Sequence, residues 1–308
     1  MADYKSILLE LEEIRARVEQ LVTVVSQLQQ AETSAAAATG ETTAAAATAA
    51  STAAGTIPAD EPKAFPPLVV EGVEEIFGGR PTKDFPDCCA VGGNEFHGYF
   101  CTGTLIAANL VVTAKHCHTP EQPVTRVFLK GHDTSKKGEE IAVIATHAHP
   151  EADLMVLVLE RDSKVNPRHV AQDAEVKAKQ GLVVGFGTTD VQGETGYGIK
   201  RKATVPIMTL NCGTDEDQVN FRCKKNIELV AGHKGIRRDT CRGDSGGPLY
   251  IESAEGGYHL LGVTSRGLKD FDHFPPQRCG NGGIYVRADQ FLGWIRDVTG
   301  ISIAGALP

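Results

Sequence analysis

Residues 238–250 read RDTCRGDSGGPLY and place two aspartates, a cysteine, a serine and three glycines within thirteen positions. Glycine adopts backbone dihedral angles that a side chain forbids, so Gly243, Gly246 and Gly247 allow the amides around Ser245 to turn toward one point. A serine in such a turn is a candidate nucleophile. Because Gly, Asp, Ser and Pro are also the usual residues of tight turns, the motif indicates catalysis only if a base lies elsewhere in the chain.

The composition predicts a globular protein with appendages. The chain has 308 residues, of which 41% are hydrophobic and 23% charged, enough to bury a large core in one or two domains. The formal net charge of -8 disfavours a nucleic-acid binder, and the sequence has neither a basic stripe with interleaved aromatics nor a P-loop.

The cysteine content and the N-terminus point to different compartments. Eight cysteines are typical of an oxidising compartment. Residues 1–20, MADYKSILLELEEIRARVEQ, carry acidic residues throughout and do not resemble a signal peptide, and no stretch is apolar for the roughly eighteen residues that a membrane span needs. We therefore expect a cytoplasmic protein without a membrane span. The cysteine content argues instead for an oxidising compartment.

A heptad pattern runs through residues 1–30. The apolar residues alternate steps of four and three, which is the seam of a coiled coil, at Ile7, Leu11, Ile14, Val18, Leu21, Val25 and Leu28. We expect residues 7–28 to bind a helical partner or a second copy of the chain. A single amphipathic helix that folds back on the main domain is the alternative, because just over three heptads are marginally stable alone.

Residues 31–75 are predicted to be a linker and propeptide. Residues 31–57 contain almost only Ala, Thr and a few small or acidic residues, so they cannot form a core and are predicted to be disordered. The prolines at positions 58, 62, 66 and 67 then keep the chain extended.

Residues 76–308 are predicted to form an all-β domain. Short β-rich runs separated by turn signals recur along it: TGTLIAANLVVTA, VTRVFLK, EIAVIATH, DLMVLVLE, QGLVVGFG, HLLGVTS and GIYVRA. Their spacing indicates a sandwich or barrels. Near the end, Phe291, Leu292, Ile295 and Val298 follow a helical spacing and predict a closing C-terminal helix.

A base and an acid occur upstream of the serine. Nucleophilic serine chemistry needs a histidine to take the proton and an acid to hold that histidine's tautomer. His116 follows a strongly apolar strand in TAKHC, and Asp153 opens the apolar run DLMVLVL. Alone, such a histidine is usually structural and such an aspartate is usually a cap. The order His116, Asp153, Ser245 with GDSGGP resembles the chymotrypsin and trypsin family of serine endopeptidases over about residues 76–300.

The resemblance implies two antiparallel β-barrels with a catalytic triad between them. It implies that His116 is the general base, that Asp153 orients it and that Ser245 attacks the scissile carbonyl, with no cofactor or metal. The backbone amides of Gly243 and Ser245 would form the oxyanion hole. Ser265 matches the serine that hydrogen-bonds the triad aspartate.

The resemblance extends to the substrate pocket. Asp239, six residues before Ser245, matches the floor of the pocket in the trypsin branch, and Gly267 and Gly283 match the small residues of its walls. Because a buried carboxylate is costly without a cation, the implied substrate is a protein cut after Arg or Lys. A solvent-facing turn residue is the weaker reading of Asp239.

The resemblance also implies disulfides. Cys101 would pair with Cys117, and Cys241 with Cys279. The default partners Cys212 and Cys223 are less certain, because the second cysteine of the family at this place aligns nearer to position 230. Two adjacent cysteines, Cys88 and Cys89, have no obvious partner and are typical of a buried strand.

The segment IFGGRP at residues 76–81 resembles the family's activation site, where a cut before the isoleucine frees an amine that pairs with the aspartate beside the nucleophile. Here these residues are Ile76 and Asp244, but Glu75 stands where digestive proenzymes carry a basic residue. An enzyme with Asp239 in its pocket would not cut there, so we expect a different activating protease that accepts VEGVEE. In the alternative, Ile76 merely begins the first strand.

Three cations are expected around the cleft. Arg266 replaces the tryptophan shelf that the family usually has, Arg242 lies at the pocket rim, and Lys115 precedes His116. They predict a preference for acidic residues near the cleavage site, unless they are solvated surface charges.

Two other functions compete with a protease. The first is a non-catalytic scaffold or binding protein that assembles through the N-terminal helix, which active-site titration would distinguish. The second is a metal protein through His147 and His149 in THAHPEAD, but two histidines are far short of a ligand set.

Overall fold

The computed structural model describes residues 76, 78–94, 98–172, 177–190, 194–236, 238–268, 279–301 and 303. The predicted heptad helix, the linker and Glu75 lie outside these residues. Among the described helices, none has the length and apolar character needed to cross a bilayer.

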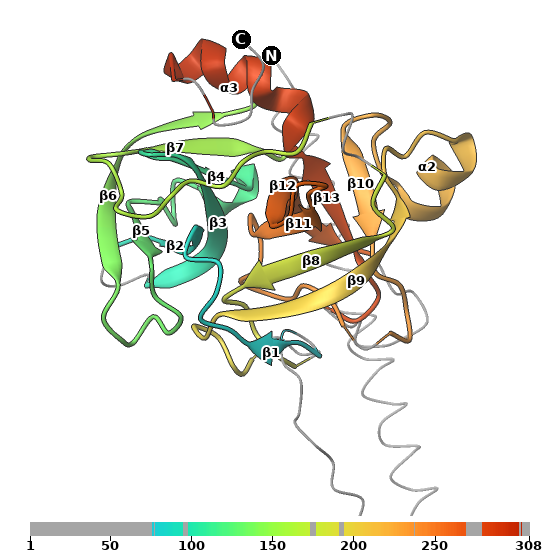
Figure 1. Ribbon diagram of the computed structural model, residues 1–308, viewed down its shortest axis with the longest axis horizontal. Helices are drawn as coiled ribbons and strands as arrows, with labels where there is room; N and C mark the ends of the chain where they lie inside the picture. The colour runs from blue at the N-terminus through green and yellow to red at the C-terminus, as the bar shows by residue number, and fades with distance from the viewer. Residues whose placement is uncertain are drawn as a thin grey trace, which may run out of the picture. The chain divides into compact units, whose positions relative to one another are not determined.

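The first half of the domain is a closed antiparallel barrel (Figure 1). Its strands follow one another around the barrel in the order β2 (Cys88–Gly92), β3 (Tyr99–Ala107), β4 (Leu110–Thr113), β7 (Met155–Leu159), β6 (Glu139–Ala148) and β5 (Arg126–Leu129). Pairing of β2 with β5 closes it.

The second half is another barrel of six strands. Their order is β8 (Gln180–Gly185), β9 (Arg201–Thr209), β10 (Glu228–Ala231), β13 (Gly283–Arg287), β12 (Tyr258–Gly267) and β11 (Pro248–Glu252), and β11 pairs with β8 to close the ring. A short strand, β1 (Arg80–Pro81), adds to the edge of β9. The prediction of two β-barrels is therefore confirmed.

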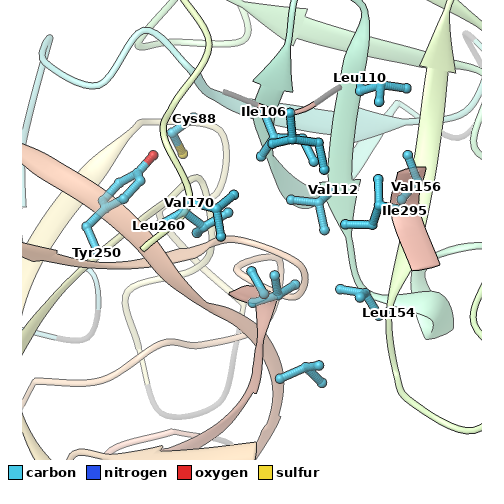
Figure 2. Close-up of a cluster of buried hydrophobic side chains, with 14 of the residues drawn as sticks. Cys88, Ile106, Leu110, Val112, Leu154, Val156, Val170, Tyr250, Leu260 and Ile295 are labelled. Carbon is cyan, nitrogen blue, oxygen red and sulfur yellow. The ribbon is translucent and has the colours of Figure 1, made fainter. Parts of the chain in front are cut away.

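The apolar runs in the sequence are continuous because both faces of several strands are buried. In β4, Val111 points into the first barrel, whereas its neighbours Leu110 and Val112 join a second cluster that includes Val263 and Tyr250 of the other barrel. Figure 2 shows this cluster, to which both barrels contribute. It fixes the two barrels against each other.

Two 3-10 turns and two short α-helices join or close the strands in the described part of the chain. The 3-10 turn η1 (Lys115–Cys117) follows β4, and α2 (Asp215–Phe221) begins with a capping box in which Thr214 accepts a hydrogen bond from the Asp217 amide. After the 3-10 turn η3 (Ala288–Phe291), α3 (Leu292–Thr299) closes the chain as predicted and packs Ile295 into the cluster between the barrels.

The sequence did not predict every element. β1, β9, β10, β11 and α2 were missed, whereas Cys88 and Cys89 lie in a buried strand, β2, as expected. Proline and charged residues weaken the β signal in RKATVPIMT and PLYIE, and only pairing with distant strands makes them β.

Candidate active site

His116 and Asp153 meet because two paired strands bring them to one barrel edge. In the register of β4 and β7, Thr113 lies opposite Met155, so residues just after β4 and just before β7 are neighbours. His116 Nδ1 lies 2.8 Å from Asp153 Oδ2, and the His116 amide donates to Asp153 Oδ1 at 3.0 Å. Two bonds between the residues fix the position of the ring.

Ser265 supplies a third contact to this carboxylate. Its hydroxyl, at the end of β12, donates to Asp153 Oδ2 at 2.6 Å, which joins the first barrel to the second. Burial alone would raise the pKa of Asp153, but the hydrogen bonds from His116 and Ser265 and the proximity of the imidazole outweigh it and lower the pKa. An ionised Asp153 keeps the proton of His116 on Nδ1 and leaves Nε2 as the base.

Gly246 lets the turn that carries Ser245 (the serine turn) pack against the 3-10 turn η1 that carries His116 (the histidine turn). Its φ is +78°, and a Cβ there would lie 2.0 Å from Thr113 Oγ1 and 2.6 Å from the Ala114 nitrogen, so only glycine fits. The Ser245 carbonyl accepts from the Thr102 amide at 2.9 Å and lies 3.6 Å from Cys117 Sγ, next to His116. Within the described residues, no hydrogen bond joins the Ser245 hydroxyl to His116, which is common before a substrate tightens such a site.

Two amides of this turn are free to bind a ligand. The amides of Asp244, Gly246 and Gly247 donate to Cys241, Thr264 and Asp244 carbonyls, respectively. The amides of Gly243 and Ser245 donate to no atom in the part of the chain that the structure describes. The Gly243 carbonyl accepts from Thr102 Oγ1 at 2.8 Å, which fixes the following peptide, and a φ of +94° makes glycine necessary at this position. Such a pair of amides can bind a developing oxyanion.

Asp244 lies beneath the same turn and is fully buried. Its two carboxylate oxygens accept from the Gly187 amide at 2.7 Å and the Cys241 amide at 2.9 Å. A Cβ at Gly185, the last residue of β8, would lie 2.0 Å from Asp244 Oδ1, so this position must be glycine. Burial raises the pKa of Asp244 to about 7, although both amide hydrogen bonds favour the charged form.

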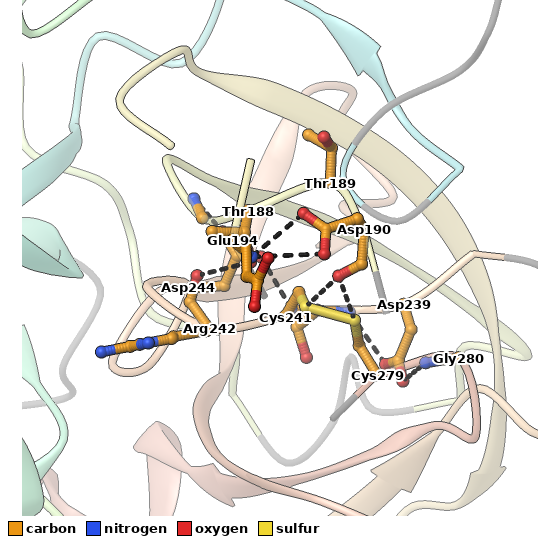
Figure 3. The surroundings of a disulfide bond; sticks show 12 residues. Thr188, Thr189, Asp190, Glu194, Asp239, Cys241, Arg242, Asp244, Cys279 and Gly280 are labelled. Atoms are coloured by element: carbon orange, nitrogen blue, oxygen red, sulfur yellow. Dashed lines mark hydrogen bonds between the residues drawn. A yellow bond between two sulfur atoms is a disulfide. The ribbon is translucent and has the colours of Figure 1, made fainter. Parts of the chain in front are cut away.

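Asp239 forms a second buried carboxylate, beside the Cys241–Cys279 disulfide (Figure 3). Oδ2 accepts from the amides of Gly280 and Gly282 at 2.8 and 2.9 Å, and Oδ1 accepts from the Thr240 amide at 2.8 Å. Burial raises the pKa of Asp239 to about 6, against the effect of these amides.

Gly267 and Gly283 lie opposite each other in the register of β12 and β13. A Cβ at Gly283 would lie 3.3 Å from Thr240 Oγ1, the neighbour of Asp239, so side chains on this strand pair would fill the space next to the carboxylate. The structure therefore places Gly283 beside the neighbour of Asp239, and Gly267 opposite Gly283.

A family profile described as Trypsin matches residues 76–295. The chain belongs to the trypsin family. Its fold of two barrels agrees with this assignment, and the family makes it a serine protease that acts on proteins.

The three predicted disulfides of this trypsin-family domain are present. They join Cys101 to Cys117, Cys212 to Cys223 and Cys241 to Cys279, with Cα atoms 6.2, 6.0 and 5.0 Å apart. The first holds the histidine turn to β3, and the third holds the loop around Asp239. Cys88 and Cys89 are unpaired and buried in β2, and burial raises the pKa of both thiols.

Two of the three cleft cations are neutralised or engaged. Arg266 forms a bidentate pair with Glu228, with both nitrogen to oxygen distances at 2.8 Å, and its Nη1 lies 3.3 Å from Ser265 Oγ. Lys115 Nζ donates to the carbonyls of His149 and Pro150. The expected attraction of acidic substrates thus rests mainly on Arg242, which is exposed.

Sequence reasoning missed Glu228 as a residue of the site. It is buried at the start of β10 and accepts hydrogen bonds from Arg266 and from the Lys224 amide at 2.7 Å. A glutamate within the apolar run IELVA was the available signal, because a buried carboxylate needs a partner. In THAHPEAD, which was weighed as a weak alternative, the two histidines do not belong to any group of three or more metal-ligating residues found among the described residues.

Proposed function

We propose that this serine protease cleaves proteins after Arg or Lys through an acyl-enzyme, and that it is made as a proenzyme activated by a cut between Glu75 and Ile76. The observation that carries the catalytic part is the pair of free amides at Gly243 and Ser245, next to the turn of a histidine that Asp153 holds. These contacts support Ser245 as nucleophile, His116 as base, Asp153 as its orienting acid and the two amides as the oxyanion site.

In the proposed reaction, Ser245 Oγ attacks the scissile carbonyl while its proton passes to His116 Nε2. The carbonyl oxygen becomes an oxyanion that the amides of Gly243 and Ser245 bind. His116 then gives the proton to the leaving amine, and a water molecule, deprotonated by the same nitrogen, hydrolyses the ester on Ser245. Asp153 stays ionised throughout and stabilises the imidazolium, consistent with its lowered pKa.

Asp239 supports the specificity for Arg or Lys. It is 1% exposed, and no Lys or Arg among the described residues pairs with it. Three amides solvate the carboxylate, but its raised pKa indicates that they leave the charge only partly compensated. A substrate cation would complete the compensation.

Ile76 and Asp244 support the activation step. Ile76 is buried in the cluster that contains Val183 of β8, and β8 ends at Gly185, which lies against the Asp244 carboxylate. A cut before Ile76 would free an amine on a residue of this cluster, and in the proposed step that amine moves to Asp244. The activating protease would have to accept Glu75, since the proposed specificity excludes self-cleavage there.

The test compares the uncut chain with a chain that begins at Ile76, released from a removable leader. Hydrolysis of Arg, Lys and Phe esters would be measured for both, with Ser245→Ala as the control. Activity on Arg and Lys that requires the cut and is lost in the control supports the proposal. Equal activity before the cut would refute activation, and a cut chain that fails active-site titration would favour the non-catalytic scaffold.

A further inference from the structure

The connection between β6 and β7 carries Asp153 on a tight turn. The turn comprises residues 149–153, HPEAD, and is closed by a hydrogen bond from the His149 amide to the Leu154 carbonyl at 2.9 Å. Asp153 has only these few residues to fix its backbone before β7 begins at Met155. The interactions within the turn therefore control where the carboxylate lies.

The His149 side chain folds back and holds the turn together. Its Nδ1 accepts from the Glu151 amide at 3.2 Å and from the Ala152 amide at 2.9 Å. Asn and Asp commonly accept a backbone amide two residues on in such turns. A histidine can do so only while Nδ1 carries no proton, because a protonated imidazole has two donors and no acceptor.

Neighbouring elements hold the ring and the turn in place. Phe291 and Trp294, at the start of the C-terminal helix, contact the ring of His149 edge to face, each with centroids 4.9 Å apart. Lys115 Nζ, next to the catalytic histidine, donates to the carbonyls of His149 at 2.9 Å and Pro150 at 3.1 Å. The turn is thus clamped between the histidine turn and α3.

We propose that His149 is a positioning residue for Asp153, and that a proton on its Nδ1 releases the 149–153 turn and disengages Asp153 from His116. The catalytic consequence rests on the proposed function of the triad. The proton would not touch the substrate. It would remove the acceptor of the two backbone amides that precede Asp153, leaving the part-buried Ala152 amide without a partner and the exposed Glu151 amide to water.

The charges around His149 favour the neutral ring. Burial lowers its pKa, and the positive charges of Lys115 and Lys224 lower it further, whereas Glu151 opposes them. The other charged groups around the turn have partners. Asp153 bonds His116, and Lys224 donates to the Glu151 carbonyl. On the elements that pack against the ring, Asp289 bonds Arg287 and Asp297 lies near Arg296. We call the two hydrogen bonds that His149 Nδ1 accepts from the turn the clamp; it is formed at neutral pH and lost in acid.

The central variant is His149→Asn, whose Oδ1 can replace Nδ1 as acceptor but does not titrate. His147→Asn is the matched control, since His147 lies in β6 two residues before His149, and no bond from it to the turn is found among the described residues. In wild type, the proton on His149 adds to the protonations that otherwise shape the acid limb of kcat/KM, so this limb should be steeper by up to about tenfold per pH unit than in His149→Asn. We expect the shallower limb in His149→Asn, and wild-type behaviour in His147→Asn.

A second readout does not depend on catalysis. Because the folded protein disfavours the protonated ring, its contribution to stability is complete above the ordinary histidine pKa of about 6.5 and is lost as pH falls through the lowered pKa. The advantage of wild type over His149→Asn in urea unfolding should therefore shrink as the pH falls from 7 to 5. Nitrogen NMR of the wild-type imidazole should show an unprotonated Nδ1 at pH 7.

The outcomes separate the clamp from the catalytic proposal. A protonated Nδ1 at pH 7, or acid limbs of equal slope in His149→Asn and wild type, would overturn the clamp, even if the variant were merely less stable at every pH. If the cut wild-type protein hydrolyses nothing, the proposed function fails, and the NMR and unfolding measurements still decide whether the turn is linked to a proton.

Discussion

If this protease selects basic residues through Asp239, as proposed, acidifying the solution should lower that selectivity. The pKa of Asp239 is about 6, so the carboxylate is mostly neutral at pH 5 and mostly ionised at pH 7. A neutral carboxyl group cannot compensate a buried guanidinium. The preference for Arg over a neutral residue of similar size should therefore decline about tenfold per pH unit below 6.

The full size of the effect follows from the burial of the carboxylate. Asp239 is 1% exposed, so a substrate cation beside it is also removed from water. Removing one partner of such a pair costs roughly 3–5 kcal/mol. Since about 1.4 kcal/mol corresponds to tenfold, Asp239→Asn should lower kcat/KM for Arg substrates by about 10²- to 10⁴-fold. Substrates with neutral residues should lose much less.

The assay is the ratio of kcat/KM for paired Arg and citrulline peptide substrates, measured with the cut enzyme between pH 5 and 8. Protonation of His116 affects both substrates equally and cancels in the ratio, so the ratio isolates the pocket. In Asp239→Asn the ratio should be low and independent of pH. A wild-type ratio that stays constant from pH 5 to 8 would show that Asp239 is not the residue that recognises the cation.

Three further outcomes follow from buried contacts. Arg168→Met should destabilise the domain by roughly 3–5 kcal/mol in urea unfolding, because buried Asp87 loses two hydrogen bonds from the guanidinium, at 2.9 and 2.5 Å. Adding Asp87→Asn should recover part of this loss, whereas additive losses would contradict the pairing. Gly246→Ala should lower the free energy of unfolding by at least about 1–2 kcal/mol, because alanine is strained in the left-handed backbone conformation. It should also displace the turn that carries Ser245 and lower kcat by about 10²-fold. A normal kcat would refute the close approach of Gly246 to Thr113. Burial raises the pKa of Asp244 in the folded protein to about 7, so the stability of the uncut chain should fall as the pH rises from 5 to 7. Cutting before Ile76, in the Ser245→Ala variant, should make stability depend less on pH. An equal pH dependence in cut and uncut chains would argue against an amine at Asp244.

The sequence predicted those parts of the fold whose signals are local. The runs around Val111 and Leu157 have β-branched and apolar residues on both faces, and both became strands buried on both sides. The disulfides and barrels followed from a resemblance that spacing made specific. By contrast, β9 contains Pro206 and two charged residues, and its strand character comes from β8 and β10 beside it.

Interactions between distant side chains were harder to predict. Asp153 and His116 were paired through the family pattern, but nothing in the sequence near Arg266 indicated that Glu228 would neutralise it. The same holds for His149, whose role as an acceptor depends on the conformation of its own turn and on α3, far along the chain. Such contacts depend on the tertiary fold rather than on any local pattern.

The three carboxylates of the site differ in where each obtains a positive partner. Asp153 has His116 within the fold and a lowered pKa. Asp239 and Asp244 have backbone amides but no Lys or Arg partner among the described residues, and the pKa of each is raised. A protein that buries two carboxylates with only partly compensated charges sacrifices stability at neutral pH. Under the proposed function, the substrate would bring the cation for Asp239, and the activating cut would create the cation for Asp244. The energetic cost in the uncut, empty protein would thus become the driving force for ordering the site when both cations arrive.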